Sequence, residues 1–171
     1  MTCPDFLTDD KLVLTFDGFK DDRAPGETFA TAYGVTEMTW AWAIGQGVVE
    51  DKPIDQATAD DCETVRKVLF WNAAHCGQLP APVALMVYND SVLTGCGHAV
   101  KLLQRLVGVD PDGDVGALTL AAVNRIAPLA LVDKLVVADE TYLAALAKAP
   151  LYLKGWERRE DYMAQHAKAM V

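Results

Sequence analysis

Hydrophobic residues recur at helical spacing along most of the chain, and short polar stretches that contain glycine or proline separate the runs. The first run predicts a helix over Asp9–Phe16. Lys20–Glu27 is polar and contains Pro and Gly, which predicts a loop, and Phe29–Val35 fits a short strand or extended segment. Thr36 followed by Glu37 then predicts the start of a helix that ends before Gly45.

Three further helices are predicted in the middle of the chain. Thr58–His75 carries acids in its first turn and bases later, the order that the helix dipole favours. Pro82 suits the first turn of a helix that ends near Thr94. His98–Val107 repeats the apolar stripe, and Gly108 is placed to end it.

The last third of the chain is also helical in pattern. Asp112-Gly113 predicts a turn before a short helix, and a longer helix is expected over Pro128–Ala147. Pro150 is expected to break the pattern, and Gly155-Trp156 to precede a last polar helix over 157–170. The pattern as a whole predicts a mainly α fold with a small β-hairpin near the N-terminus.

Composition narrows the class of protein. The 171 residues suffice for one sizeable core. The net charge of −9 argues against nucleic-acid binding, which usually requires a basic face. Apolar residues make up 51% of the chain but form no run near the roughly 20 residues needed to cross a bilayer. Without a secretory pattern at its start, the protein is expected to be made in the cytoplasm without a signal peptide and not to insert into a membrane.

Metal-binding patterns are weak. The cysteines are Cys3, Cys62, Cys76 and Cys96, without CxxC spacing, and we expect them to be reduced. His75-Cys76 with Cys96 and His98 could be drawn as a zinc site, but the spacing matches no common zinc motif. Asp110, Asp112 and Asp114 alternate like the start of a calcium loop that lacks its closing glutamate. The sequence therefore predicts no metal and no cofactor.

Several short motifs follow one another at characteristic intervals. They are Asp17-Gly18, Ala30-Thr31, Gly34-Val35-Thr36, Phe70-Trp71, AVKLLQRLVG at 99–108, Asp112-Gly113 and Gly155-Trp156. In this order they resemble the glycoside hydrolase family 108 muramidases, lysozyme-like enzymes of phages and secretion systems that cut the glycan of peptidoglycan. The resemblance implies a lysozyme-like part over residues 1–95 and a helical peptidoglycan-binding-like part over 96–171, packed into one compact unit.

The chain departs from the family pattern at positions where the resemblance implies active-site residues. Asp17 stands where the resemblance implies a catalytic glutamate. Gly26-Glu27-Thr28-Phe29 replaces an Asp-Pro-Gly-Gly loop, and Asn89 and Leu93 stand where the family has Asp and Asn. The chain keeps the scaffold motifs better than the site motifs.

Glycosidic cleavage needs an acid to protonate the leaving oxygen, and usually a second carboxylate. Asp17 lies beside Phe16 and Phe19, and apolar surroundings raise a carboxyl pKa toward the working range. Glu27 could supply the second carboxylate and Thr31 could orient a water. Asp is shorter than Glu by roughly 1.3 Å, however, and a misplacement near 1 Å can cost about a hundredfold in rate. Asp17 is equally consistent with a helix end, and Glu27 with a solvated loop.

The expected substrate-binding residues are Trp71, Trp42, Asn89 and Tyr33. Aromatic faces suit sugar rings, although a Trp in an amphipathic helix is usually part of the core.

The leading hypothesis is an N-acetylmuramidase that binds peptidoglycan strands and cleaves the β-1,4 bond between N-acetylmuramic acid and N-acetylglucosamine, for phage lysis or wall passage, in the periplasm or cell wall after release or secretion. One alternative is an inactive lysozyme-like module that binds peptidoglycan or a protein partner. Another is an enzyme of altered specificity, because Asn89 and Leu93 could reshape a subsite.

Overall fold

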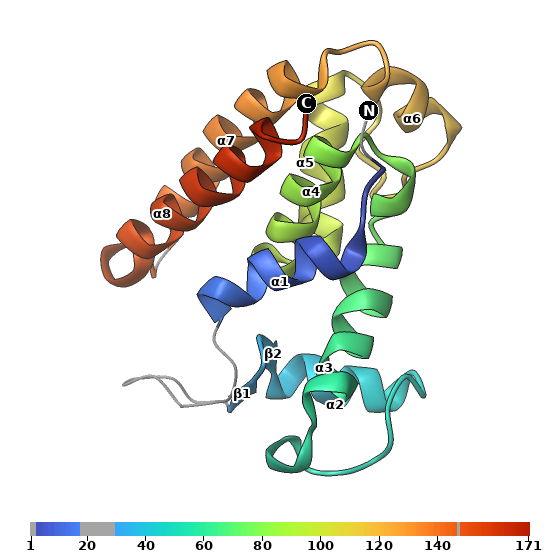
Figure 1. The fold of residues 1–171 in the computed structure, drawn as a ribbon, viewed down its shortest axis with the longest axis vertical. Coiled ribbons are helices and arrows are strands. Elements are labelled where there is room, and N and C mark those ends of the chain that lie inside the picture. The colour runs from blue at the N-terminus through green and yellow to red at the C-terminus, as the bar shows by residue number, and fades with distance from the viewer. Residues whose placement is uncertain (1–2, 18–29, 147) are drawn as a thin grey trace.

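The protein is mainly helical, as the sequence predicted. The computed structural model describes residues 3–17, 30–146 and 148–171, and these form eight α-helices and one two-stranded antiparallel sheet (Figure 1). The helices are α1 (Phe6–Asp17), α2 (Glu37–Gly45), α3 (Ala59–Arg66), α4 (Ala81–Thr94), α5 (Cys96–Val107), α6 (Ala117–Val123), α7 (Pro128–Ala144) and α8 (Ala149–Lys168). The strands are β1 (Thr31–Ala32) and β2 (Val35–Thr36). Ile54–Gln56 and Cys76–Gln78 are 3-10 turns, and Lys67–Asn72 is a π-helix that follows α3 directly.

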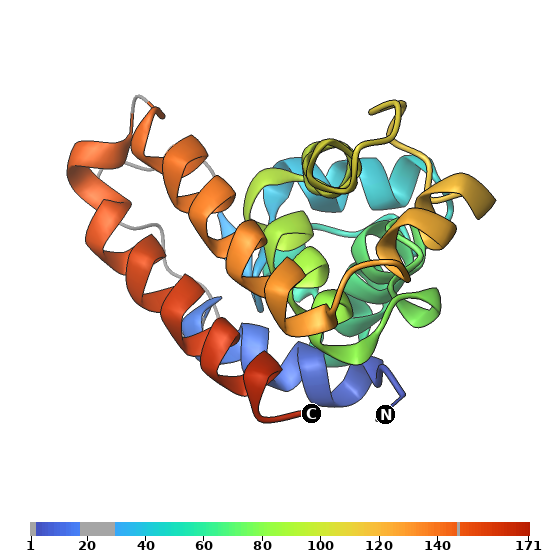
Figure 2. The same cartoon turned by 90° about the horizontal axis from the view of Figure 1, so that it is seen from above.

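Helix α4 is the centre of the molecule. Its residues 81–91 are all buried, which fits a helix that is apolar on every side. Helices α5, α7 and α8 pack around it and α1 crosses it, while α7 and α8 form a long pair along one side (Figure 2). Pro82 lies in the first turn of α4, where its missing N–H removes no hydrogen bond.

Two hydrophobic clusters divide the described residues. The larger surrounds α4 and includes buried residues from Phe6 to Ala167. The smaller joins the hairpin to α2 and α3, with Val35, Trp40 and Val65 at its centre. The larger cluster draws residues from both sides of position 95, so the predicted halves share one core.

The turn and cap signals in the sequence have structural counterparts. Gly108 ends α5 with a φ of 76°, in the left-handed region that favours glycine. Gly113 has a φ of 92°, and Asp112 accepts hydrogen bonds from the Gln104 side chain (2.7 Å) and from the Asp114 N–H (2.8 Å). Asp112 is therefore a turn residue, as its position suggested.

Some boundaries differ from the prediction. The Pro150 break was wrong, because α8 begins at Ala149 and holds Pro150 in its first turn, where proline fits. Gly155-Trp156 accordingly lies inside α8 rather than before it. Helix α7 ends at Ala144, and the predicted loop Lys20–Glu27 lies outside the described residues. None of the described helices combines the length and apolar character that a membrane span requires.

Candidate active site

The predicted catalytic acid lies at the C-terminal end of helix α1. Asp17 is the last residue of that helix, and its side chain, like all of Glu27, lies outside the described residues. The preceding residue, Phe16, packs edge-on against Tyr162 of α8, with ring centroids 5.1 Å apart. Val13, one turn earlier, is fully buried in the larger cluster. The end of α1 is thus anchored on the helical core.

The predicted water-orienting residue begins the β-hairpin. Thr31 is half-buried in β1 and pairs with Thr36 of β2. Tyr33 and Gly34 form the two-residue turn, with φ of 47° and 75°, the combination of a type I′ hairpin turn. Thr36 ends β2 and caps α2, because its hydroxyl accepts the Thr39 N–H at 3.2 Å. This cap confirms the predicted start of that helix.

A buried ion pair joins these two elements. Arg66 of α3 donates two hydrogen bonds to Asp10 of α1, at 2.6 and 2.8 Å. A third nitrogen of Arg66 donates to the carbonyl of Tyr33 in the hairpin turn, and the Tyr88 hydroxyl donates to Asp10. One guanidinium therefore fixes α1, α3 and the hairpin relative to one another.

Electrostatics keep Arg66 charged and the Tyr88 hydroxyl protonated in this network. Burial alone would lower the pKa of Arg66, but the hydrogen bond and charge of Asp10 outweigh it and raise that pKa. Burial and the Asp10 charge raise the pKa of Tyr88, so its hydroxyl stays protonated and donates. Sequence spacing could not reveal this network, because Asp10 and Arg66 are 56 positions apart. The only signal was an arginine inside the apolar stripe of a predicted helix.

The predicted substrate-binding residues do not lie in similar environments. Trp71 is 6% exposed and packs edge-on against Phe6 and Tyr88. Asn89 is fully buried and bonds Glu160 of α8. In this conformation neither offers a surface to a ligand.

Trp42 and Tyr33 are more accessible. Trp42 is 54% exposed on α2, immediately after the hairpin. The half-buried Tyr33 packs against the smaller cluster, in the turn that follows Thr31. An aromatic pair is thus available on the elements that adjoin Thr31.

The side chain of Asn89 is hydrogen-bonded to two residues of helix α8. Its amide donates to Glu160 at 2.6 Å, and its oxygen accepts from Arg159 at 2.6 Å. All three side chains are at most 4% exposed, and they join the middle of α4 to α8. Asn89 therefore connects the central helix α4 to helix α8.

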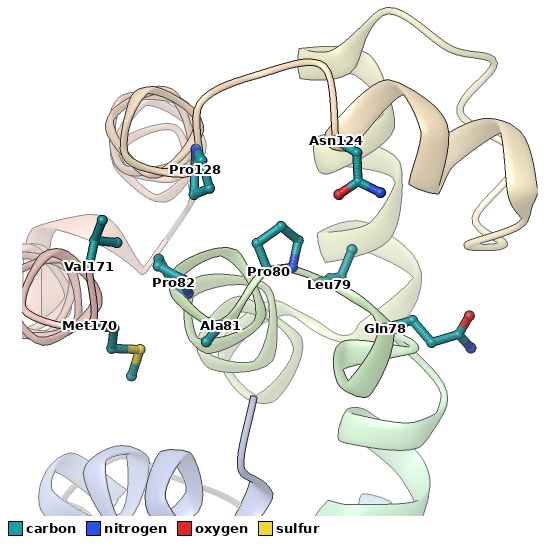
Figure 3. A pocket seen from close by; sticks show the side chains of 9 residues that line it. All are labelled: Gln78, Leu79, Pro80, Ala81, Pro82, Asn124, Pro128, Met170 and Val171. Atoms are coloured by element: carbon teal, nitrogen blue, oxygen red, sulfur yellow. The ribbon is translucent and has the colours of Figure 1, made fainter. Parts of the chain in front are cut away.

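A separate cavity of about 600 Å³ lies at the start of α4. Pro80 and Pro82 line one side, with Pro128 at the start of α7 and Met170 near the chain end (Figure 3). None of the described residues that line it is acidic. Its described lining therefore lacks the carboxylates that glycosidic cleavage needs.

Two sequence families match this chain. Residues 13–95 match the glycosyl hydrolase 108 family, and residues 98–161 match the predicted peptidoglycan domain. The first part of the chain is thus similar to glycosyl hydrolase 108 proteins, and the second part to predicted peptidoglycan domains. This confirms the resemblance seen in the motifs. The glycosyl hydrolase 108 match spans every predicted site residue from Asp17 to Asn89.

A solved structure has the same fold. The chain superposes on SagA of Brucella abortus with a TM-score of 0.87 and 29% sequence identity, over 96% of this chain and 94% of SagA. No curated protein matches the sequence. The glycosyl hydrolase 108 match supports a glycoside hydrolase, and the second match supports peptidoglycan as its substrate.

Proposed function

We propose that the protein is an N-acetylmuramidase that hydrolyses the β-1,4 bond between N-acetylmuramic acid and N-acetylglucosamine. The observation that carries this proposal is the match of residues 13–95 to the glycosyl hydrolase 108 family beside a predicted peptidoglycan domain. The biological setting would be phage lysis or wall passage, with the enzyme acting in the periplasm or cell wall.

Asp17 would be the general acid. It would protonate the glycosidic oxygen as the bond to the anomeric carbon breaks, and a water would add to that carbon. Glu27 would accept the proton of this water, or Thr31 would orient it by hydrogen bonding. Trp42 and Tyr33 are the aromatic residues that could contact a sugar ring, since Trp71 and Asn89 are buried.

The scaffold supports these roles because it holds the two contributing elements rigidly. The end of α1 rests on Tyr162 through Phe16, and the turn after Thr31 is bonded to Arg66. Arg66 in turn holds Asp10 on α1. Catalytic groups must be held within a fraction of an ångström, and a buried bidentate ion pair is a rigid way to do so.

The test is release of soluble fragments from purified peptidoglycan. Wild type should release fragments that carry N-acetylmuramic acid at the reducing end, identified after borohydride reduction as the muramic alditol. Asp17→Asn should abolish release. Glu27→Gln should reduce it strongly if the carboxylate activates water, and Thr31→Val should do so if the hydroxyl does. Fragments ending in N-acetylglucosamine would contradict the assigned bond.

Position 17 itself favours a second function, an inactive module that binds the wall or a protein partner. The resemblance implies glutamate there, and the aspartate carboxylate is shorter. If wild type is inert and Asp17→Glu gains activity, the site is a remnant. Sedimentation with intact sacculi would then distinguish a wall binder, which pellets, from a protein-interaction module, which stays in solution.

A further inference from the structure

Three side chains of the types that can bind metal ions meet in the interior, away from the residues proposed for catalysis. They are Asp90 of α4, His98 of α5 and Asp139 of α7, and one ligand atom from each lies within 4.8 Å of the others. The three residues come from three helices that pack against each other. Sequence spacing could not reveal the group, because 49 positions separate its first and last members.

The ligand atoms of this group lack hydrogen-bond partners. Asp90 and Asp139 are each 1% exposed. Both carboxylate oxygens of Asp139, Oδ2 of Asp90 and Nε2 of His98 are buried and accept no hydrogen bond from a described donor group; Asp90 and Asp139 can satisfy each other only by sharing a proton. Buried polar atoms in native proteins are nearly always satisfied, so four orphaned atoms in one place indicate a missing occupant.

The surrounding residues orient the ligands. The Thr94 hydroxyl donates to Oδ1 of Asp90 at 2.6 Å, which leaves Oδ2 free to bind. The His98 ring stacks on Tyr142 of α7, with centroids 3.8 Å apart and an interplanar angle of 30°. Metal ligands are commonly held by such outer contacts.

The charge of the site fits a cation. Two buried carboxylates face a histidine, and the carboxylate of Glu160, whose Oε2 is also buried without a partner, adds to the negative potential. Arg159 supplies a positive charge from α8, but its Nε is bonded to Asn89. A divalent ion would balance the two aspartates directly.

We propose that Asp90, His98 and Asp139 bind one divalent transition-metal ion, with Zn²⁺ as the best fit. One imidazole with two carboxylates is a donor set that zinc accepts. Three atoms within 4.8 Å of one another share a point no more than about 2.8 Å from each, so shifts under about 1 Å reach the roughly 2.0–2.2 Å bonds of zinc.

The ion would have a structural role. Asp90 belongs to the glycosyl hydrolase 108 match, and His98 and Asp139 belong to the peptidoglycan-domain match. One ion would therefore join the two matched regions through α4, α5 and α7. This inference does not depend on the proposed hydrolysis, because none of its ligands is assigned to catalysis.

The test uses the full chain after dialysis against a chelator. Titration with Zn²⁺, followed by calorimetry, should show one ion per chain. A saturating hundredfold excess over the dissociation constant should raise the unfolding temperature by about 5–10 °C. Co²⁺ should give the strong visible absorption of a tetrahedral ion.

Variants then locate the ion. His98→Gln and Asp139→Asn should each weaken Zn²⁺ binding at least tenfold and abolish the Co²⁺ spectrum. The matched controls are His75→Gln and His166→Gln, the other two histidines of the chain, which should bind as wild type does. His98 is only half-buried, so its replacement should fold even if Asp139→Asn does not.

Two results would overturn the proposal. Wild type that binds no Zn²⁺ would mean that Asp90 and Asp139 are held together by a shared proton. If the His98→Gln and Asp139→Asn variants both still bind Zn²⁺ as tightly as wild type, the ion binds at another site.

Discussion

At the scale of single residues, buried charge is the feature that most affects how this protein behaves. Arg66, Asp10, Asp9 and Glu160 are all at most 3% exposed. Charged side chains are seldom fully buried unless they are paired. Whether each group has a partner therefore decides the sign of its contribution to stability.

Because Arg66 is paired with Asp10, replacing Arg66 should destabilise the folded protein. Arg66→Met leaves the Asp10 carboxylate buried without its cation and should lower the free energy of unfolding by about 3–5 kcal/mol. Arg105→Met, on an exposed position of α5, is the control and should change it by less than about 0.5 kcal/mol. Urea denaturation measures both. The double variant Asp10→Leu/Arg66→Met should lose much less than the two single losses added together, and simple additivity would show that the pair is not coupled.

Asp9 differs from Arg66 because one oxygen of its carboxylate has no hydrogen-bond partner. Removing the charge of Asp9 should therefore stabilise the protein rather than destabilise it. Burial, and then the charge of Asp5, raise the pKa of Asp9 to about 7, and its Oδ2 has no hydrogen-bond partner. Because this pKa is higher in the folded than in the unfolded state, the contribution of Asp9 to stability is fully present below its unfolded-state pKa near 4. That contribution is lost as the pH rises to about 7. Asp9→Asn should therefore be more stable than wild type at pH 8, by on the order of 2–4 kcal/mol.

The measurement is urea denaturation from pH 4 to pH 8. The stability difference between Asp9→Asn and wild type should grow with pH up to about 7 and then level off. Asp55→Asn, on an exposed 3-10 turn, serves as the control and should show no such trend. A pH-independent difference for Asp9→Asn would contradict the assignment.

At the scale of elements, the β-hairpin matters because it carries Thr31 and is tied to α1 through Arg66. Gly34 in its turn and Gly108 at the end of α5 have nearly the same φ, 75° and 76°. Alanine at either site is strained, so each replacement should lower the free energy of unfolding by about 1 kcal/mol. Only Gly34→Ala should also lower peptidoglycan hydrolysis, because only it disturbs the hairpin.

Gly108→Ala is the matched control for that experiment. Activity is compared at a temperature at which thermal scans show both variants folded. Equal activity of the two variants would mean that the hairpin geometry does not affect hydrolysis.

The elements were also the most predictable part of the molecule. Helical periodicity, the Thr36 cap and the Gly108 end located α2 and α5 nearly residue by residue. Pro150 misled the prediction because the same residue can end one helix or begin the next, and the local sequence does not say which. The Asp10–Arg66 pair and the Asp90–His98–Asp139 group escaped prediction because packing, rather than sequence spacing, brings them together.

At the scale of the whole molecule, the two matched regions share one core. Helix α4 belongs to the glycosyl hydrolase 108 match, yet α5, α7 and α8 from the other region cover it. Leu85, Met86 and Tyr88 are fully buried in consequence. A fragment that ends at residue 95 would expose this apolar helix on several sides.

Residues 1–95 alone should therefore not fold as a stable unit. The smaller cluster around Trp40 and Val65 is intact in that fragment, but the larger one loses all of its buried members from Ala99 to Ala167. Thermal scans by circular dichroism should show one cooperative transition for the full chain and a gradual, non-cooperative change for the fragment. The fragment should also bind a hydrophobic dye that the full chain excludes. A sharp transition in the fragment, without dye binding, would instead show that the glycosyl hydrolase 108 region is an independent domain, and that α4 repacks once its neighbours are removed.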